Sequence, residues 1–163
     1  IFPNQYETFK KVIDERTSLP FRINCEGYFI KEDKILAKDS KKGYIIFPGG
    51  GIDNESIEEG LKRETYEETG AIIKNLKKLG TLKIIWDKNR PKTKTQKERY
   101  KRFQGDEMHF FSGKIKEFKT LTKKDKDYWG PNLIPIKEVI KLIKPFNEYH
   151  KKQLEFLRNL TWK

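Results

Sequence analysis

Cysteine, histidine and methionine are scarce in this sequence, which contains one Cys, two His and one Met in 163 residues. The single cysteine, Cys25, excludes a disulfide within the chain, and with only His109 and His150 beside it a Cys/His zinc cluster is also excluded. Long apolar runs are absent too, because the richest, Tyr44 to Phe47, is far shorter than the roughly 20 residues of a membrane span. We therefore expect a protein of a reducing compartment, the cytoplasm, without a membrane partner.

Positive charge dominates what is present. The chain has 36 Lys and Arg against 24 Asp and Glu, which gives a net charge of +12. This excess favours anionic partners such as nucleotides, nucleic acid or phosphates. A second interpretation attaches no function to it, because 29 Lys against 7 Arg is a bias that a genome's composition can produce. With 35% hydrophobic residues the chain can bury one core, so we expect a single domain over residues 1–163.

Apolar periodicity and turn residues predict alternating strands and helices. Ser56 and Glu59 form a capping-box pattern at the start of one helix, and Gly70 stands where a left-handed stop is expected. In chain order we expect a helix through Tyr6, Phe9 and Ile13, a hairpin of 23–30 with 35–37, a strand over 44–47, a helix over 56–69, strands over 76–86 and 107–115, an edge strand over 133–136 leading into a helix through 144, and a last helix after Pro145.

Residues 88–102 differ from the rest because they carry eight Lys or Arg residues and one acid, Glu98. Runs of like charge are typical of solvated segments, and we predict a flexible hairpin loop here. The alternative is a loop that contacts phosphates or RNA.

The helix over residues 56–69 places acids on an unusual face. With successive residues about 100° apart, Ile57 and Leu61 mark the core-facing direction at 0° and about 40°. Glu64 and Glu68 fall at about −20° and about +20°, so both carboxylates continue the stripe that should be apolar. A surface helix would place its acids on the opposite side.

Glu67 lies on the shoulder of this stripe, and the three carboxylates together are energetically unfavourable. Like charges three or four residues apart cost about 0.2–0.5 kcal/mol per pair in the open, and partial burial raises that cost. The helix dipole also disfavours anions in the last turn. A divalent cation would offset these penalties, and an all-oxygen site suits Mg²⁺ or Mn²⁺. The alternative is an acidic helix end that overhangs the sheet into water.

These acids belong to a longer motif that begins in the glycine run. Five residues separate Gly49 from Glu55, and seven more precede the segment Arg63-Glu64-Thr65-Tyr66-Glu67-Glu68-Thr69-Gly70-Ala71. The pattern resembles the Nudix box, G-x5-E-x7-R-E-U-x-E-E-x-G-U, where U is apolar, and all seven fixed residues match. Thr65 departs from it, because the family has an apolar residue there. The motif covers 23 residues, and the arrangement of the elements around it is also similar.

The resemblance implies both a fold and a reaction. The fold would be an α/β (α+β) sandwich with a mixed central sheet and helices on both faces. Members of the family hydrolyse a pyrophosphate bond in a nucleoside diphosphate joined to another group, using one or more Mg²⁺.

The resemblance also assigns roles by position. Glu67, Glu68 and the carbonyl of Gly49 or Gly50 would bind the metal, and Glu64 would be a further ligand or would orient the attacking water. The ion pair of Arg63 with Glu55 would hold the glycine loop on the helix.

Several residues outside the motif are further candidates. Glu107 precedes an apolar strand and could be a fourth ligand or the general base; the alternative is an exposed strand-end acid. His109 is interpreted as a packed strand residue. Lys38 could contact a phosphate or be a solvated lysine. Trp129, beside Gly130, is the most loop-like of the aromatic residues that could stack on a base.

We predict a Mg²⁺-dependent hydrolase of small nucleoside di- or triphosphates or their derivatives. One alternative keeps this chemistry but acts on the 5′ end of RNA, held by residues 88–102. Another is a catalytically silent nucleotide-binding module, against which the intact set of glutamates argues.

Overall fold

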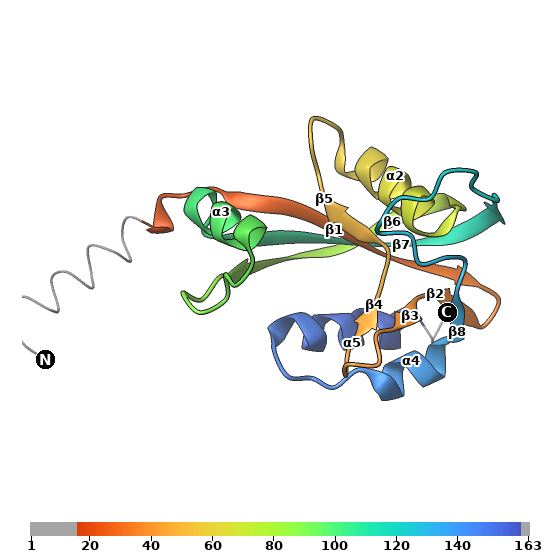
Figure 1. Ribbon diagram of the computed structural model, residues 1–163. Coiled ribbons are helices and arrows are strands. Elements are labelled where there is room, and N and C mark those ends of the chain that lie inside the picture. The colour runs from red at the N-terminus through yellow and green to blue at the C-terminus, as the bar shows by residue number, and fades with distance from the viewer. Residues whose placement is uncertain (1–15, 161–163) are drawn as a thin grey trace, which may run out of the picture. The chain divides into compact units, whose positions relative to one another are not determined.

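The computed structural model describes residues 16–160, which form two compact units (Figure 1). Within this range, unit 1 contains residues 16–23 and 83–107, and unit 2 contains residues 24–82 and 108–160. Three strands contribute residues to both units: β1 (Phe21–Lys31), β6 (Ala71–Ile85) and β7 (Gly105–Phe118). The helix predicted through Tyr6, Phe9 and Ile13 lies outside the described residues.

The central sheet has six strands in the order β6-β7-β1-β2-β8, with β5 also paired to β1. The short members are β2 (Lys34–Leu36), β5 (Gly49–Gly51) and β8 (Leu133–Pro135), and a separate two-stranded sheet pairs β3 (Lys38–Asp39) with β4 (Ile45–Ile46). Helices α2 (Ile57–Thr69), α4 (Ile136–Leu142) and α5 (Glu148–Leu160) belong to unit 2, and α3 (Lys94–Arg102) belongs to unit 1. No helix in this part of the chain is long and apolar enough to cross a membrane.

Helices cover both faces of the sheet in unit 2. Successive strand residues point to opposite faces, so Tyr28 and Phe110 join the core beneath α4 and α5, whereas Phe29 and Phe111 join the core beneath α2. All four rings are at most 2% exposed. Figure 1 shows α2 on one side of the strands and α4 and α5 on the other. The predicted α+β class with a mixed central sheet is confirmed.

Most element boundaries lie near the predicted ones. The hairpin of β1 and β2 pairs Ile30 with Ile35, and Glu32 in its turn has a φ of 61°. β8 is the edge strand and leads directly into α4, and α5 follows Pro145. The main shift is in β6, which begins at Ala71 rather than at Leu76.

The prediction of a flexible loop over residues 88–102 was wrong for its second half, which forms α3. Thr93 caps this helix, because its hydroxyl accepts a hydrogen bond from Gln96 N at 3.1 Å and Gln96 Oε1 accepts one from Thr93 N at 3.2 Å. This reciprocal pair satisfies backbone donors that a helix start leaves free. No residue of α3 is buried, and its sequence, KTQKERYKR, has no apolar stripe. Periodicity therefore could not have marked this helix.

Candidate active site

The helix α2 begins and ends at the predicted signals. The Ser56 hydroxyl accepts a hydrogen bond from Glu59 N at 3.1 Å. At the other end Gly70 adopts a left-handed conformation with φ of 79°, and its N–H donates to Tyr66 O at 2.8 Å. These caps fix how the residues between them are distributed around the helix axis.

The inner face of α2 carries the expected mixture of apolar and acidic residues. Leu61 and Thr65 are fully buried and Glu68 is 8% exposed, while Glu64 keeps 20% of its side chain exposed and Glu67 keeps 39%. Thr65 fits the position where the motif has an apolar residue because its hydroxyl donates to Leu61 O at 2.7 Å. The predicted inward orientation of Glu64 and Glu68 is therefore confirmed.

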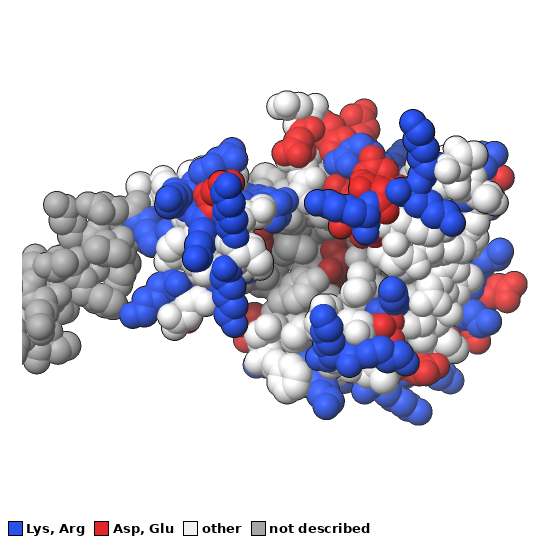
Figure 2. All heavy atoms as spheres, viewed as in Figure 1, with Lys and Arg blue, Asp and Glu red and all other residues white. Residues whose placement is uncertain are grey.

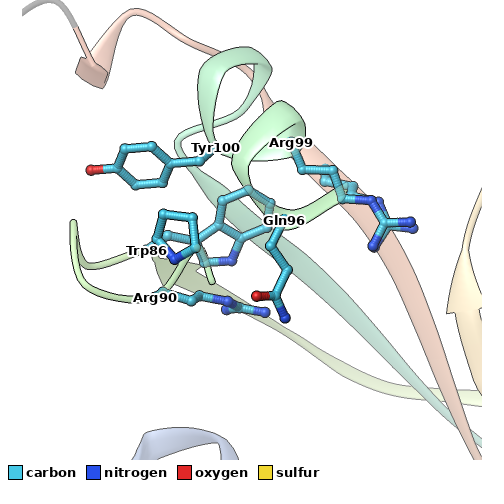
Figure 3. Close-up of a pocket in the computed structure, with 7 residues that line it drawn as sticks. Trp86, Arg90, Gln96, Arg99 and Tyr100 are labelled. Atoms are coloured by element: carbon cyan, nitrogen blue, oxygen red, sulfur yellow. The ribbon is translucent and has the colours of Figure 1, made fainter. Parts of the chain in front are cut away.

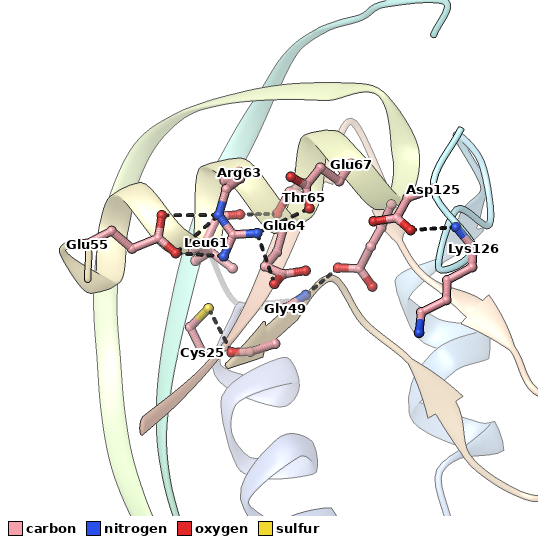
Figure 4. Close-up of polar contacts among 12 residues, drawn as sticks. Cys25, Gly49, Glu55, Leu61, Arg63, Glu64, Thr65, Glu67, Asp125 and Lys126 are labelled. Carbon is pink, nitrogen blue, oxygen red and sulfur yellow. Dashed lines mark hydrogen bonds and ion pairs between the residues drawn. The ribbon is translucent and has the colours of Figure 1, made fainter. Parts of the chain in front are cut away.

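The glycine strand β5 lies against these two carboxylates, and Figure 4 shows Glu64 beside Gly49. The Gly49 N–H donates to Glu68 Oε1 at 3.0 Å. At Gly50, a Cβ atom would fall 2.9 Å from the Cδ atom of Glu64, so a larger residue here would displace the Glu64 carboxylate. β5 is held from behind by β1, where Cys25 pairs with Gly50 and its thiol donates to the Gly50 carbonyl at 3.5 Å.

Trp129 holds the second oxygen of Glu68. Its indole Nε1–H donates to Glu68 Oε2 at 3.2 Å, and the backbone N–H groups of Trp129 and Gly130 donate to the Glu68 carbonyl at 2.8 and 3.0 Å. The sequence interpretation of Trp129 as a base-stacking residue did not include this contact. No local pattern links two residues 61 positions apart, so sequence reasoning could not have found it.

Arg63 connects the start of the motif to its acidic end. Its Nη2 lies 2.6 Å from Glu55 Oε1, which is the ion pair that the motif predicts. Its Nη1 lies 3.2 Å from Glu64 Oε1 and 3.1 Å from Glu67 Oε2 (Figure 4). One guanidinium is thus shared by three carboxylates, and Glu68 is left without a cationic partner among the described residues.

The electrostatics of this cluster reflect an excess of negative charge. Burial raises the pKa of the Glu68 carboxyl to about 8; the charges of Glu64 and Asp127 act in the same direction, and the hydrogen bonds from Gly49 and Trp129 oppose them. Burial likewise raises the pKa of Glu64, against the effect of Arg63. Both shifts indicate that a nearby cation would be favoured.

The carboxylates face protein donors rather than a common point. Within residues 16–160, no three acidic, histidine or cysteine side chains are arranged as a metal-binding group. Glu64 and Glu67 instead contact Arg63, and Glu68 contacts Gly49 N–H and Trp129. The donor chemistry does fit a hard divalent cation, because the last two turns of α2 supply three carboxylates and two of them lie beside the backbone of β5.

The other predicted site residues belong to other elements. Glu107 belongs to β7 in unit 1, where its Oε1 is 3.9 Å from Lys83 Nζ. Lys38 is an exposed residue of β3, paired with Ile46 of β4, and its ammonium forms no ion pair within the described part of the chain. His109 is 7% exposed in β7, as expected of a packed strand residue.

A buried carboxyl that the sequence interpretation missed lies behind β5. Glu26 is 5% exposed and sits opposite Gly49 in the register of β1 and β5. It accepts hydrogen bonds from the Tyr28 hydroxyl at 2.7 Å, from Gln153 Nε2 at 3.1 Å and from the Tyr149 hydroxyl. Burial raises its pKa, against the effect of these hydrogen bonds. An acid between apolar residues of a predicted strand was the available signal.

Comparison with protein-family models matches residues 26–157 to the NUDIX domain. This range covers most of the chain and includes all of β5 and α2.

Curated relatives are similar over part of their length. Nudix hydrolase 18, mitochondrial, from Arabidopsis thaliana is 36% identical over 73 residues, which cover 42% of this chain and 39% of that protein. The ADP-ribose pyrophosphatase of Methanocaldococcus jannaschii is 34% identical over 91 residues, which cover 49% of this chain and 53% of that protein. The matched part of this chain therefore spans about two fifths of the length of the Arabidopsis relative and about half of the length of the Methanocaldococcus relative.

Solved structures share the fold over a longer range. The NUDIX hydrolase from Nitrosomonas europaea superposes with a TM-score of 0.59 and 17% identity, covering 83% of this chain and 86% of that one. At this level of identity the match shows the architecture alone.

Proposed function

This chain belongs to the Nudix family of hydrolases, whose model matches residues 26–157, and from this premise we propose that it is a Mg²⁺-dependent pyrophosphohydrolase. Its substrate would be a nucleoside di- or triphosphate or a nucleoside diphosphate derivative, and residues 1–163 would act as one Nudix hydrolase domain. The observation that supports this most is Glu68, which is buried against the glycine strand beside Glu64 and has no cationic partner among residues 16–160.

In this proposal Glu64, Glu67, Glu68 and the Gly49 carbonyl would hold Mg²⁺. The ion, when bound, would neutralise diphosphate oxygens and lower the pKa of an attacking water. Glu64 and Glu67 would turn from Arg63 toward the ion, while Glu68 is already fixed by hydrogen bonds from Gly49 N–H and from the Trp129 indole.

The remaining residues of the proposed site position these groups or contact the substrate. The Arg63–Glu55 ion pair ties the loop after β5 to α2, so the glycine backbone stays beside the carboxylates. Gly50 leaves room for Glu64 and for a phosphate to approach the backbone. We also propose Lys38 as a phosphate contact and Glu107 as the general base.

The printed name of one relative supports a small nucleotide as the substrate. The relative from Methanocaldococcus jannaschii is named as an ADP-ribose pyrophosphatase, so its substrate contains the bond that the proposal requires. For this chain we propose a small nucleoside diphosphate derivative as the substrate. We also propose the cytoplasm as its location.

A phosphate-release screen across nucleotide classes, with Mg²⁺ or with EDTA, tests the proposal. We expect turnover of at least one nucleoside di- or triphosphate or derivative in Mg²⁺, loss in EDTA, and recovery when excess Mg²⁺ or Mn²⁺ is added. Glu58→Gln removes an exposed acid from the same helix and should keep full turnover. Nucleotide binding without turnover of any substrate would instead support a silent binding module.

A second candidate substrate, the 5′ end of RNA, is favoured by the charge of unit 1. Residues 88–102 carry eight Lys or Arg residues, and α3 exposes most of its own. 5′-Triphosphorylated RNA belongs in the same screen. Turnover of this RNA but of no mononucleotide would replace the first candidate by the second.

A further inference from the structure

Unit 1 concentrates the positive charge of the molecule. Its described residues, 16–23 and 83–107, contain eleven Lys and Arg against four Asp and Glu, a net charge of +7 out of +12 for the whole chain. Figure 2 shows Lys and Arg side chains crowded over α3. Lys94, Lys97, Lys101 and Arg102 are exposed on this helix. The surface therefore suits a partner with several negative charges.

A small pocket opens within this unit. It has a volume of about 80 Å³, and its lining includes three arginines and two aromatic rings: Arg22, Arg90, Arg99, Trp86 and Tyr100 (Figure 3). No acidic residue is part of this lining. Since one water needs about 10–15 Å³ of such space, the pocket has room for a phosphate-sized group and is too small for a drug-sized ligand of about 300 Å³ or more.

The structure holds one of these guanidinium groups in place. Arg90 lies over the Trp86 ring at 4.8 Å from its centroid, and its Nη1 is 3.5 Å from Asp106 Oδ2. The same carboxylate oxygen accepts a hydrogen bond from Trp86 Nε1 at 2.8 Å. Asp106 thus fixes both the ring and the cation, and within the described residues this ion pair occupies only part of the five-donor guanidinium of Arg90.

Arg99 contributes a second cation to the lining of the pocket. It comes from α3 and is half-buried, and in the part of the chain that the structure describes no hydrogen bond or ion pair involves its guanidinium. Arg99 lines the same pocket as Arg22 and Arg90, and an anion bound there would be shared by the three guanidinium groups. Phosphate is suited to this, because guanidinium groups bind its oxygens through paired donors.

Aromatic and cationic groups alternate beside the pocket. The Arg16 guanidinium lies 3.4 Å from the centroid of the Tyr100 ring, and its Nη1 donates to Tyr100 O at 2.8 Å. Binding surfaces for single-stranded nucleic acid combine a positively charged track for the backbone with aromatic and arginine planes that stack on bases. An acidic peptide would use the charges but not the rings.

We propose that unit 1 binds single-stranded nucleic acid, with one backbone phosphate among Arg22, Arg90 and Arg99 and the flanking nucleotides along α3. Binding of this kind goes beyond the proposed hydrolase, because it needs neither the metal nor turnover.

The test measures binding of a fluorescently labelled twelve-nucleotide RNA, and of DNA of the same sequence, to the full chain by anisotropy in EDTA. Arg99→Gln should weaken binding about tenfold, since a lost charge-assisted contact to phosphate has about this effect. The slope of log affinity against log salt should fall in magnitude by about 0.7, the value for one single-strand phosphate contact. Arg90→Gln should have the same effect, with far-ultraviolet circular dichroism to confirm that the variant folds.

A matched control removes charge without touching unit 1. Lys116→Gln is an exposed change in unit 2 and should leave affinity within about twofold. Loss of affinity in this control equal to that of Arg99→Gln would overturn the proposal, as would equal binding of a duplex, or competition by polyglutamate as effective as by RNA. Preference for RNA over DNA, or equal binding of both, agrees with it. Because binding is measured without metal, its outcome is independent of the phosphate-release screen.

Discussion

Glu68 is the side chain of the proposed site whose position and charge are most restricted by its surroundings. It is almost fully buried, accepts hydrogen bonds from the glycine strand and from Trp129, and has its pKa raised to about 8 by burial. A carboxyl in this environment either holds a proton or lies beside a cation. The proposed Mg²⁺ would supply that cation.

Removing one carboxylate charge should therefore impair the reaction. We expect Glu67→Gln or Glu68→Gln to lower kcat by about 10²-fold or more, because each change removes a proposed metal ligand. Glu67 is the cleaner position, since its carboxylate is partly exposed and, among the residues that the structure describes, Arg63 is its one ionic partner. Turnover assays with circular dichroism as a folding check measure this, and full activity of either variant would contradict the assignment.

A second residue-scale prediction concerns Glu26. Burial raises the pKa of this carboxyl above the unfolded value of about 4.5. Above that pH the folded state therefore binds more protons than the unfolded state, and the free energy of unfolding falls as pH rises. Glu26→Gln keeps the shape and can still accept from Tyr28 and Gln153. The Tm of Glu26→Gln relative to the parent should therefore increase from pH 5 to pH 8, measured in EDTA.

The control for this experiment is Glu58→Gln, an exposed acid whose Tm difference should not change with pH. A constant difference for Glu26→Gln as well would show that Glu26 is not the titrating group.

At the scale of elements, α3 depends on its cap more than on packing, because none of its residues is buried. Thr93→Ala should destabilise the helix by about 1 kcal/mol, which raises its unfolded fraction roughly fivefold. Limited trypsin digestion reports this directly, since α3 contains several Lys and Arg. Thr95→Ala, an exposed position within the helix, should leave the cleavage rate nearly unchanged, and equal rates for the two variants would contradict a capping role.

The contrast between α2 and α3 shows which helices can be predicted from the sequence. α2 was predicted within a residue because caps at both ends and a recurring apolar stripe act through neighbours in the chain. α3 has the same kind of start, Thr93 with Gln96, but no stripe, so its charge was interpreted as that of a loop. Contacts such as Trp129 to Glu68 or Tyr149 to Glu26 join distant residues, and periodicity contains no information about them.

At the scale of the whole molecule, a net charge of +12 should not attract Mg²⁺ in general. Stabilisation by Mg²⁺ would therefore report a local acidic site. We expect the free energy of unfolding to rise by about 2.7 kcal/mol at a Mg²⁺ concentration of 100 times Kd, and EDTA to abolish the gain. Denaturant titrations at matched ionic strength measure this effect. An equal gain in Glu67→Gln or Glu68→Gln, or none in the parent, would contradict metal binding by these residues.

The burial of Cys25 has a practical consequence. Burial raises the pKa of this thiol to about 12, so almost none of it is the reactive thiolate at neutral pH. Because it is the only cysteine in the chain, a cysteine introduced on α3 or at the end of α2 would be the sole position open to a maleimide dye. Native protein can thus be labelled at one chosen point without first replacing Cys25.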